Sequence, residues 1–427
     1  MRSYRIVFAL ILLFTLSFYS AVSACTKKVV VSPSKDCDRQ FKYENASYII
    51  RTRLDLKGRV LVVPNNSKLV FEGGRLFNGT VSGNNTTIQA DKILVFENVR
   101  IVGSWNNNKV YSEWLDFNAG NRADNAGNFN NLMSLCTGES LTHLYMQEGV
   151  YYCSVIKESS NIQVPSNVYW HNSATIKQLP TALQKYALVL IKQVSNVTID
   201  GGEFVGDVQT HTSEEGEWGH GIKVAGGTNV VLKNFTTREF WGDGIDLIEG
   251  EYDGKIRAGI GPCEKVVIDN VKCLYNRRQG LSIEAARDVV VKNSEFAFTG
   301  KFKMTKPGCG VDIEPWCANE EKIINIRFLD CNIHDNNPQR DLCLEPNAKY
   351  HVNKNSELKP PANNIDIKRS KIGRLFIIGA TLVKIEDCDI DGISQYLHGE
   401  RIVINNCRIT KKEDIRPRSG LTIKRCK

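Results

Sequence analysis

The 427-residue sequence has few of the patterns that assign a function directly. It contains no P-loop, no CxxC pair of the zinc-binding kind and no basic block interleaved with aromatic residues. After the first two dozen residues, no apolar segment approaches the length that a membrane-spanning helix needs. The sequence therefore gives no support to P-loop nucleotide chemistry, to nucleic-acid binding or to a polytopic membrane protein.

The N-terminus differs from the rest of the chain. Arg2 and Arg5 precede the apolar run IVFALILLFTLSF, which ends at the small residues AVSA. This pattern predicts a secretory signal over residues 1–24. The junction VSAC also resembles a bacterial lipobox, so we expect Cys25 to be lipidated and to anchor the protein in a bacterial envelope, periplasmic or at the cell surface. Cleavage after Ala24 and plain secretion is the alternative.

The remaining chain has the composition of a soluble globular protein, with 42% hydrophobic and 24% charged residues. Loss of the predicted signal lowers the formal net charge from +8 to +6. Such a diffuse positive charge would not repel an anionic polymer, but it is too weak to indicate a nucleic-acid partner.

A short internal repeat dominates the C-terminal third of the chain. The phrases NNIDIKRSKI, LVKIEDCDI, RIVINNCRI and GLTIKRC place their central isoleucines 18, 19 and 19 residues apart. Similar phrases occur earlier at longer, irregular intervals. Strands in which apolar and polar residues alternate, repeated at such a short period, predict an all-β fold. We expect a right-handed single-stranded parallel β-helix with loops inserted into its middle coils.

Twelve cysteines follow Cys25. Four of them, Cys331, Cys388, Cys407 and Cys426, stand at one position of the repeat, so we expect them to stack inside the coil as small core residues. Neighbouring coils are close enough for disulfides as an alternative. Asn and Asp residues at the preceding turn position are expected to form a ladder; they are Asn234, Asn270, Asn293, Asp330, Asp387 and Asn406.

The segment SEWLDFNAGNRADNAGNFNNLMSLC, followed by LTHLYMQEGVYYCS, resembles the opening of the pectate-lyase superfamily of β-helix proteins. The resemblance implies a short capping helix and a β-helix domain over residues 111–427, although the turn at 147–151 lacks the usual proline. Residues 25–110 look like the β-rich N-terminal extension of exported gut-bacterial relatives. Proteins of this superfamily include lyases, hydrolases, epimerases and non-catalytic binders, so the resemblance specifies the fold more than the chemistry.

A second phrase places acidic residues on one face of the predicted helix. GHGIKVAG, GDGIDLIE, RQGLSIEA, GCGVDIEP and QRDLCLEP align on their glycine or, in the last, on Asp341. The apolar residues of each phrase point inward, so the residues between them share the opposite face. The predicted columns are Lys223, Asp246, Ser282, Asp312 and Cys343, and Ala225, Ile248, Glu284, Glu314 and Glu345.

The acidic residues of these two columns form a stripe on one face of the predicted helix, and this stripe is the predicted catalytic site. Asp246 and Asp312, two coils apart, would be separated by roughly 9 to 10 Å, near the spacing of an inverting glycosidase. We therefore expect them to be the acid and base, with Asp243, Glu284 and Glu314 tuning or sharing that role. Solvated acids on a sheet face are the plainer interpretation.

The second column also suggests a cation site. Glu284, Glu314 and Glu345 would lie one coil apart, at about 5 Å, so mutual repulsion should raise at least one of their pKa values. Calcium could neutralise them instead. We expect that no cofactor is required and keep calcium as the alternative.

Other residues near the stripe suit a sugar substrate. Trp241 and Trp316, like Trp218, flank the phrases where an indole can stack on a pyranose. His220 and Lys223 could bind a substrate carboxylate or assist proton transfer, and Arg277 and Arg278 could bind a substrate anion. Glu345 is a further candidate substrate-binding residue. Packing, turn capping and ordinary surface charge are the alternatives for these residues.

GDGIDL is similar to the aspartate-bearing strand of polygalacturonase-type glycosidases, but Gly244 replaces the second aspartate and the other motifs differ in order. We expect a glycoside hydrolase acting on a polysaccharide or oligosaccharide, including an anionic one. The alternatives are a polysaccharide lyase or uronate epimerase with calcium, and a non-catalytic glycan-binding or surface-structural solenoid. A monomer is expected rather than a trimer.

Overall fold

The computed structural model describes residues 27–33, 36–155, 162–250, 261–315, 322–336, 340–347, 362–395, 400–415 and 420–427. The predicted signal, Cys25 and Trp316 lie outside these residues. The chain divides into two compact units, Met1–Asn107 and Asn108–Lys427. No helix in the described part of the chain is long and apolar enough to cross a membrane.

The first unit is built from parallel strands. They pair in the order β1-β2-β5-β6-β3, and β4 and β7 also pair with the long strand β6. The short 3-10 helix η1 (Cys37–Gln40) lies between β1 and β2. The strands are β1 (Lys27–Val31), β2 (Ala46–Ile50), β3 (Arg53–Asp55), β4 (Val60–Val62), β5 (Lys68–Phe71), β6 (Arg75–Gln89) and β7 (Phe96–Trp105).

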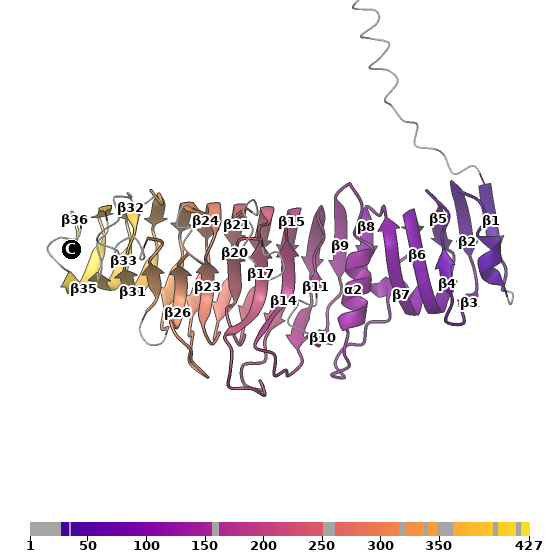
Figure 1. Cartoon of the computed structure of the whole chain (residues 1–427), viewed down its shortest axis with the longest axis horizontal. Coiled ribbons are helices and arrows are strands. Elements are labelled where there is room, and N and C mark those ends of the chain that lie inside the picture. Colours follow the sequence, from indigo (N-terminus) through magenta and orange to yellow (C-terminus); the bar gives the residue numbers. More distant parts are fainter. Residues whose placement is uncertain are drawn as a thin grey trace, which may run out of the picture. The chain divides into compact units, whose positions relative to one another are not determined.

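The second unit contains two long parallel sheets whose strands follow one another in chain order, as Figure 1 shows. The 12-stranded sheet comprises β8 (Lys109–Tyr111), β9 (Thr142–Met146), β12 (Val168–Asn172), β15 (Ser195–Asp200), β18 (Thr228–Lys233), β21 (Cys263–Asp269), β24 (Ala286–Lys292), β27 (Ile323–Leu329), β30 (Ile365–Lys368), β32 (Thr381–Glu386), β34 (Glu400–Asn405) and β36 (Leu421–Lys424).

The 17-stranded sheet carries the acidic phrases. It comprises β10 (Val150–Cys153), β11 (Ile162–Gln163), β13 (Thr175–Gln178), β14 (Lys185–Lys192), β16 (Glu203–Val205), β17 (Trp218–Ala225), β19 (Thr236–Arg238), β20 (Ile245–Ile248), β22 (Lys272–Leu274), β23 (Gln279–Ile283), β25 (Glu295–Ala297), β26 (Cys309–Ile313), β28 (Asn332–His334), β29 (Leu342–Leu344), β31 (Lys371–Ile377), β33 (Asp389–Gln395) and β35 (Arg408–Ile415).

The strand register confirms the repeat. Ile367 pairs with Ile385, Ile385 with Ile404 and Ile404 with Ile423. The first three of these isoleucines are fully buried, because the inward residues of each coil stack into one continuous apolar core. Parallel strands that return to the same sheet through right-handed crossovers form the predicted right-handed parallel β-helix.

The expected ladder of turn residues is confirmed in part, since Asn293 donates to Asp269 and Asp330 pairs with Arg369 instead. Asn234, Asn270 and Asn406 adopt the left-handed conformation, with φ between 53° and 60°, which Asn and Asp tolerate best after glycine. The amide of Asn270 donates to Oδ1 of Asn234 at 3.0 Å, and that of Asn406 donates to Oδ1 of Asp387. The ten cysteines whose side chains are described are unbridged, and nine of them are buried.

A short helix stands at the beginning of the second unit. The 3-10 helix η2 (Ser112–Trp114) precedes α2 (Ala126–Ser134), as the capping-helix prediction required. Asp124 Oδ1 accepts a hydrogen bond from the backbone N–H of Ala126 at 2.9 Å, satisfying one of the free donors at the helix start. Phe129 and Leu132 are fully buried on its inner face.

Candidate active site

Five neighbouring strands of the 17-stranded sheet build the site. Their register pairs Lys223 with Asp246, Asp246 with Ser282, Ser282 with Asp312, and Asp312 with Cys343. This is the first of the two predicted columns. The alternate residues, such as Ile245 and Leu247, are fully buried in the core, so the column occupies the opposite face of the sheet.

That opposite face is not an open, solvated stripe. Asp246 is 1% exposed and Asp312 is 0% exposed. Cationic side chains lie against the carboxylates: Lys223 beside Asp246, and Arg278 beside Asp243. The plainer interpretation, solvated surface acids, is therefore wrong for these residues. Buried carboxylates need partners. Those partners differ along the column, which therefore has a first part around Lys223 and Asp246 and a second part around Asp312 and Cys343.

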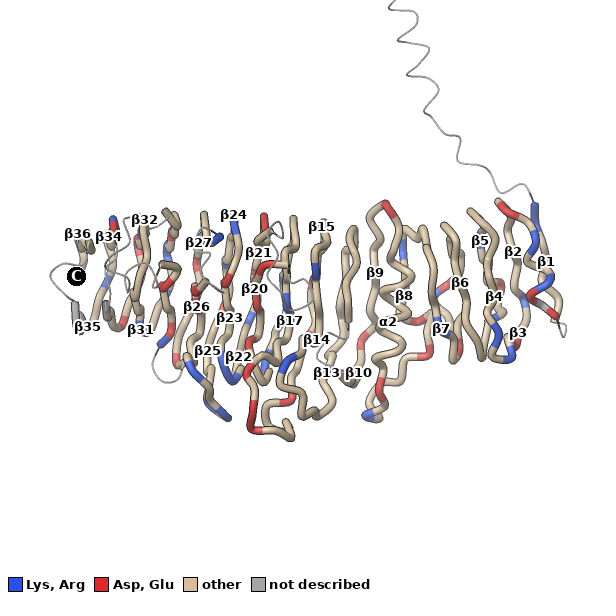
Figure 2. The backbone as a smooth tube through the Cα atoms, in the orientation of Figure 1, with Lys and Arg blue, Asp and Glu red and all other residues tan. Residues whose placement is uncertain are grey.

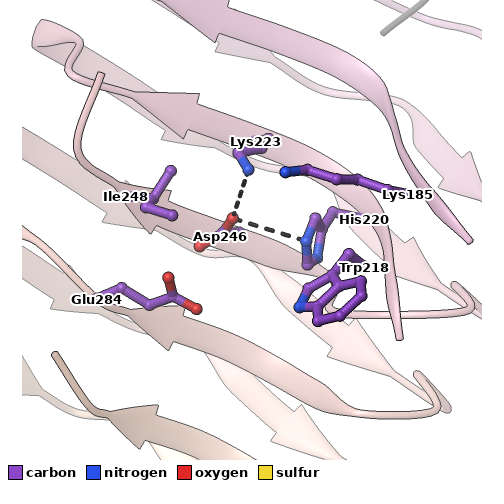
Figure 3. A pocket seen from close by; sticks show the side chains of 7 residues that line it. All are labelled: Lys185, Trp218, His220, Lys223, Asp246, Ile248 and Glu284. Carbon is purple, nitrogen blue, oxygen red and sulfur yellow. Dashed lines mark ion pairs between the residues drawn. The ribbon is translucent and has the colours of Figure 1, made fainter. Parts of the chain in front are cut away.

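The first part lines a cavity that is open to solvent; its empty volume, including part of the solvent at its mouth, is about 450 Å³. Figure 3 shows the Asp246 carboxylate between Lys223 and His220, with Glu284 on the side of Asp246 away from Lys223. The cavity reaches the surface beside Trp218, which is 36% exposed. Its lining residues are Lys185, Trp218, His220, Lys223, Asp246, Ile248 and Glu284.

Asp246 lies between two basic side chains. Its Oδ2 is 3.6 Å from Lys223 Nζ and 3.7 Å from His220 Nε2. Burial raises the pKa of Asp246, while the charges of Lys223 and His220 oppose that rise. His220 Nδ1 lies 3.2 Å from the backbone nitrogen of Asp243 and 3.3 Å from Asp243 Oδ2, so Asp243 orients the ring with Nε2 toward Asp246.

Glu284 is the more strongly perturbed acid of the cavity. It is 5% exposed, and its Oε2 has no hydrogen-bond partner among the described residues. Burial raises the pKa of Glu284 well above the ordinary value, and the negative charge of Asp246 raises it further. The protonated form of Glu284 is therefore favoured relative to an ordinary glutamate. Repulsion by the other glutamates was the predicted cause, but burial has the larger effect.

Arg278 joins the two parts of the column. Its guanidinium contacts Asp243 Oδ2 at 3.0 Å and Glu314 Oε1 at 2.8 Å, and it donates to Gln279 Oε1 at 2.9 Å. These anions raise the pKa of Arg278 despite its burial. The structure gives Arg278 internal anionic partners, and its predicted role in binding a substrate anion stays a prediction.

The second part of the column is centred on Asp312. Ligand oxygens of Asp312, Glu314 and Glu345 lie within 4.8 Å of one another. Burial raises the pKa of Asp312 well above its ordinary value, and burial together with Glu314 raises the pKa of Glu345 to about 7. The predicted cation site contained Glu284 with Glu314 and Glu345. In the structure Glu284 lines the cavity instead, and Asp312 is the residue grouped with the other two.

Two further predictions fail because the side chains are packed. Trp241 is 0% exposed; the ring of His211 stacks on it at 4.0 Å, and the Arg277 guanidinium lies 3.8 Å from its centroid. Arg277 also donates to the carbonyl of Gly216 at 2.7 Å. Neither residue can present itself to a sugar, and Trp218 is the indole that reaches the cavity.

Sequence reasoning missed Lys185. It belongs to β14, in a coil that lacks the glycine phrase used for alignment, and it pairs in register with Trp218 of β17. The apolar run of KYALVLIK indicates a buried strand, but the position of its first residue depends on the register across an inserted loop.

No protein-family model matches the chain. Uncharacterized protein YclG of Bacillus subtilis is 24% identical over 224 residues, which is 48% of this chain and 38% of that protein. The chain thus spans about two fifths of the length of this relative. Among solved structures, ORF18 of Geobacillus virus E2 has a TM-score of 0.47 and 12% identity, covering 74% of this chain and 60% of that one. Pectate lyase Pel9A has a TM-score of 0.37 and 12% identity, covering 76% and 79%.

The fold is a parallel β-helix. The assignment follows from the strand order and register of the chain itself, in which every strand pair of the two long sheets is parallel.

Proposed function

We propose that the protein is a carbohydrate-active enzyme that cleaves a polysaccharide, and that it does so as a glycoside hydrolase. The observation that carries this proposal is the pair of buried carboxyl groups, Asp246 and Glu284, that open into one cavity from neighbouring coils. Two carboxyl groups in different electrostatic surroundings are what acid–base cleavage of a glycosidic bond requires.

The surroundings assign a role to each acid. Burial and the nearby Asp246 raise the pKa of Glu284 well above its ordinary value, which favours its protonated form, so Glu284 is the candidate general acid that protonates the leaving oxygen. Asp246 faces Lys223 and His220, which favour its ionised form, so it serves as the base or nucleophile. Glu284 thereby replaces Asp312 as the partner of Asp246, because Asp312 does not line the cavity.

The rest of the cavity suits a sugar polymer. Trp218 presents an exposed indole at the rim, where it can stack on a pyranose ring, and Lys185 lies nearby as a cation for an anionic sugar. A lyase or uronate epimerase is the second candidate. The close grouping of Asp312, Glu314 and Glu345 favours it, since three carboxylates within 4.8 Å could hold calcium.

The test is a panel of plant, host and microbial polysaccharides incubated with the purified protein, with and without EDTA. Reducing ends formed without unsaturated-uronate absorbance, and lost in Glu284→Gln and Asp246→Asn, are expected for the hydrolase. Absorbance abolished by EDTA would instead identify the lyase. Binding without turnover, unchanged in both variants, would identify a non-catalytic glycan binder. Asp389→Asn, at an exposed ion pair with Arg408, is the matched control.

We also propose that residues 1–24 export the protein and that Cys25 carries a lipid anchor. Metabolic labelling with a fatty acid tests this directly: the label should appear on the wild-type protein and be absent from Cys25→Ser. A labelled variant, or an unlabelled wild type, would refute the anchor.

A further inference from the structure

Two thiols and a carboxylate meet in the second part of the column. Cys343 of β29 pairs in register with Asp312 of β26, so their side chains lie side by side on the same sheet face. Cys309, the first residue of β26, brings its Sγ to 3.0 Å from Sγ of Cys343. Possible ligand atoms of Cys309, Cys343 and Asp312 all lie within 4.8 Å of one another.

The group is closed to solvent and one of its oxygens lacks a donor. All three residues are 0% exposed, and Phe376 packs against the two cysteines. Gln279 Nε2 donates to Asp312 Oδ2 at 2.8 Å, but Asp312 Oδ1 is buried with no hydrogen-bond partner among the described residues. An unsatisfied buried carboxylate oxygen is costly, and a bound cation is one way to satisfy it.

We propose that Cys309, Cys343 and Asp312 form a binding site for a thiophilic divalent cation of the zinc class. Glu345 lies with Asp312 in a separate cluster of carboxylate oxygens, and Glu314 is held by Arg278 at 2.8 Å. Two thiolates and one carboxylate leave the fourth position of a tetrahedral site to water, and the sulfur ligands select zinc over calcium.

A disulfide is the competing use of the two thiols. The Sγ atoms would have to separate from 3.0 Å to about 3.8 Å for tetrahedral zinc, or approach to about 2.05 Å for a disulfide. The metal accounts for more of the site, because a disulfide leaves Asp312 Oδ1 without a partner. Gln279, which holds the other oxygen of Asp312, then orients a metal ligand from the neighbouring coil.

The experiment uses the purified protein, reduced and freed of metal with a chelator. Zinc is titrated against a chromophoric competitor, and cobalt is titrated separately while its spectrum is recorded. We expect one equivalent of zinc, displacement of about two thiol protons, and a sulfur-to-cobalt charge-transfer band with tetrahedral d–d absorption. Millimolar calcium should not compete.

Three variants locate the site. Cys343→Ser should remove the charge-transfer band and weaken zinc binding by at least about 100-fold, whereas Gln279→Met should weaken it by about 10- to 100-fold while the band remains. Cys388→Ser, in the buried cysteine stack, should bind like the wild type. Circular dichroism of each variant separates loss of ligation from loss of fold.

Several results would overturn the site. These are a cobalt spectrum without thiolate character, calcium competing on equal terms with zinc, or protein isolated without reductant that carries a Cys309–Cys343 disulfide, seen as a mass 2 Da lower in the linked peptides. Because none of these measurements uses a polysaccharide, failure of the metal site and failure of the proposed hydrolase are distinguishable.

Discussion

The central and C-terminal coils of the second unit follow the same alternation but use their outward face differently. In the C-terminal coils, successive central isoleucines are 18 or 19 residues apart, and outward charges form exposed ion pairs such as Arg408 with Asp389. In the central coils the corresponding register partners, from Ile199 to Ile367, are 23 to 39 residues apart. There the outward Asp246 and Asp312 are buried.

The difference shows what the inserted segments do. Figure 2 shows acidic and basic residues interspersed along both groups of coils, so composition does not separate them. The added residues in the central coils contribute side chains that cover the sheet, for example Arg278 over Asp243 and Trp218 at the cavity rim. Burial then raises the pKa values of the central acids, whereas acids on the regular coils remain exposed.

The largest expected effect is on turnover. Glu284→Gln should lower kcat by about 10²- to 10⁴-fold, because the amide cannot donate the proton that the buried carboxyl supplies. Glu386→Gln, a partly exposed carboxylate of a C-terminal coil paired with Lys368, should leave kcat unchanged. Equal losses in both variants would mean that the central cavity is not the catalytic site.

The next effect is on stability. Arg278→Met should lower the free energy of unfolding by about 3–5 kcal/mol, because the buried Asp243 carboxylate and Glu314 both lose the guanidinium that pairs with them. Arg408→Met removes a pair whose side chains are 71% and 42% exposed, so urea unfolding should hardly change. If the two variants unfolded at the same urea concentration, burial would not distinguish the two groups of coils.

The column itself could be predicted from sequence, but its burial could not. Glycine-aligned phrases and a period of two determine which residues share a face, and the register from Lys223 to Cys343 follows that alignment. Burial depends on long side chains from other coils, which have no fixed sequence offset. Trp218 and Trp241 therefore looked equivalent, although one is 36% exposed and the other 0%.

The pH dependence of stability should also differ between the two groups of coils. Glu345 has its pKa raised in the folded state to about 7 from an ordinary value of 4.5, so the folded protein binds more protons than the unfolded chain between these values. Stability must then fall as pH rises from about 4.5 to about 7, and further loss stops above that range. Glu345→Gln should make this fall shallower in urea unfolding measured at several pH values, whereas Glu386→Gln should not. A steeper fall in Glu345→Gln would contradict the assigned direction.

The smallest expected effect is that of Trp218→Ala on substrate binding, and Trp241→Ala is its comparison. Trp218→Ala should raise KM by about 5-fold, since loss of one stacking contact removes about 1 kcal/mol of binding, and should leave the thermal midpoint nearly unchanged. Trp241→Ala should instead lower stability by about 3–5 kcal/mol, because it removes a fully buried indole packed between His211 and Arg277. Initial rates over a range of substrate concentrations, with thermal unfolding of the same samples, measure both quantities. If Trp218→Ala lowered the thermal midpoint as much as Trp241→Ala, the exposed indole would be a structural residue, and the cavity rim would have lost its sugar-stacking surface.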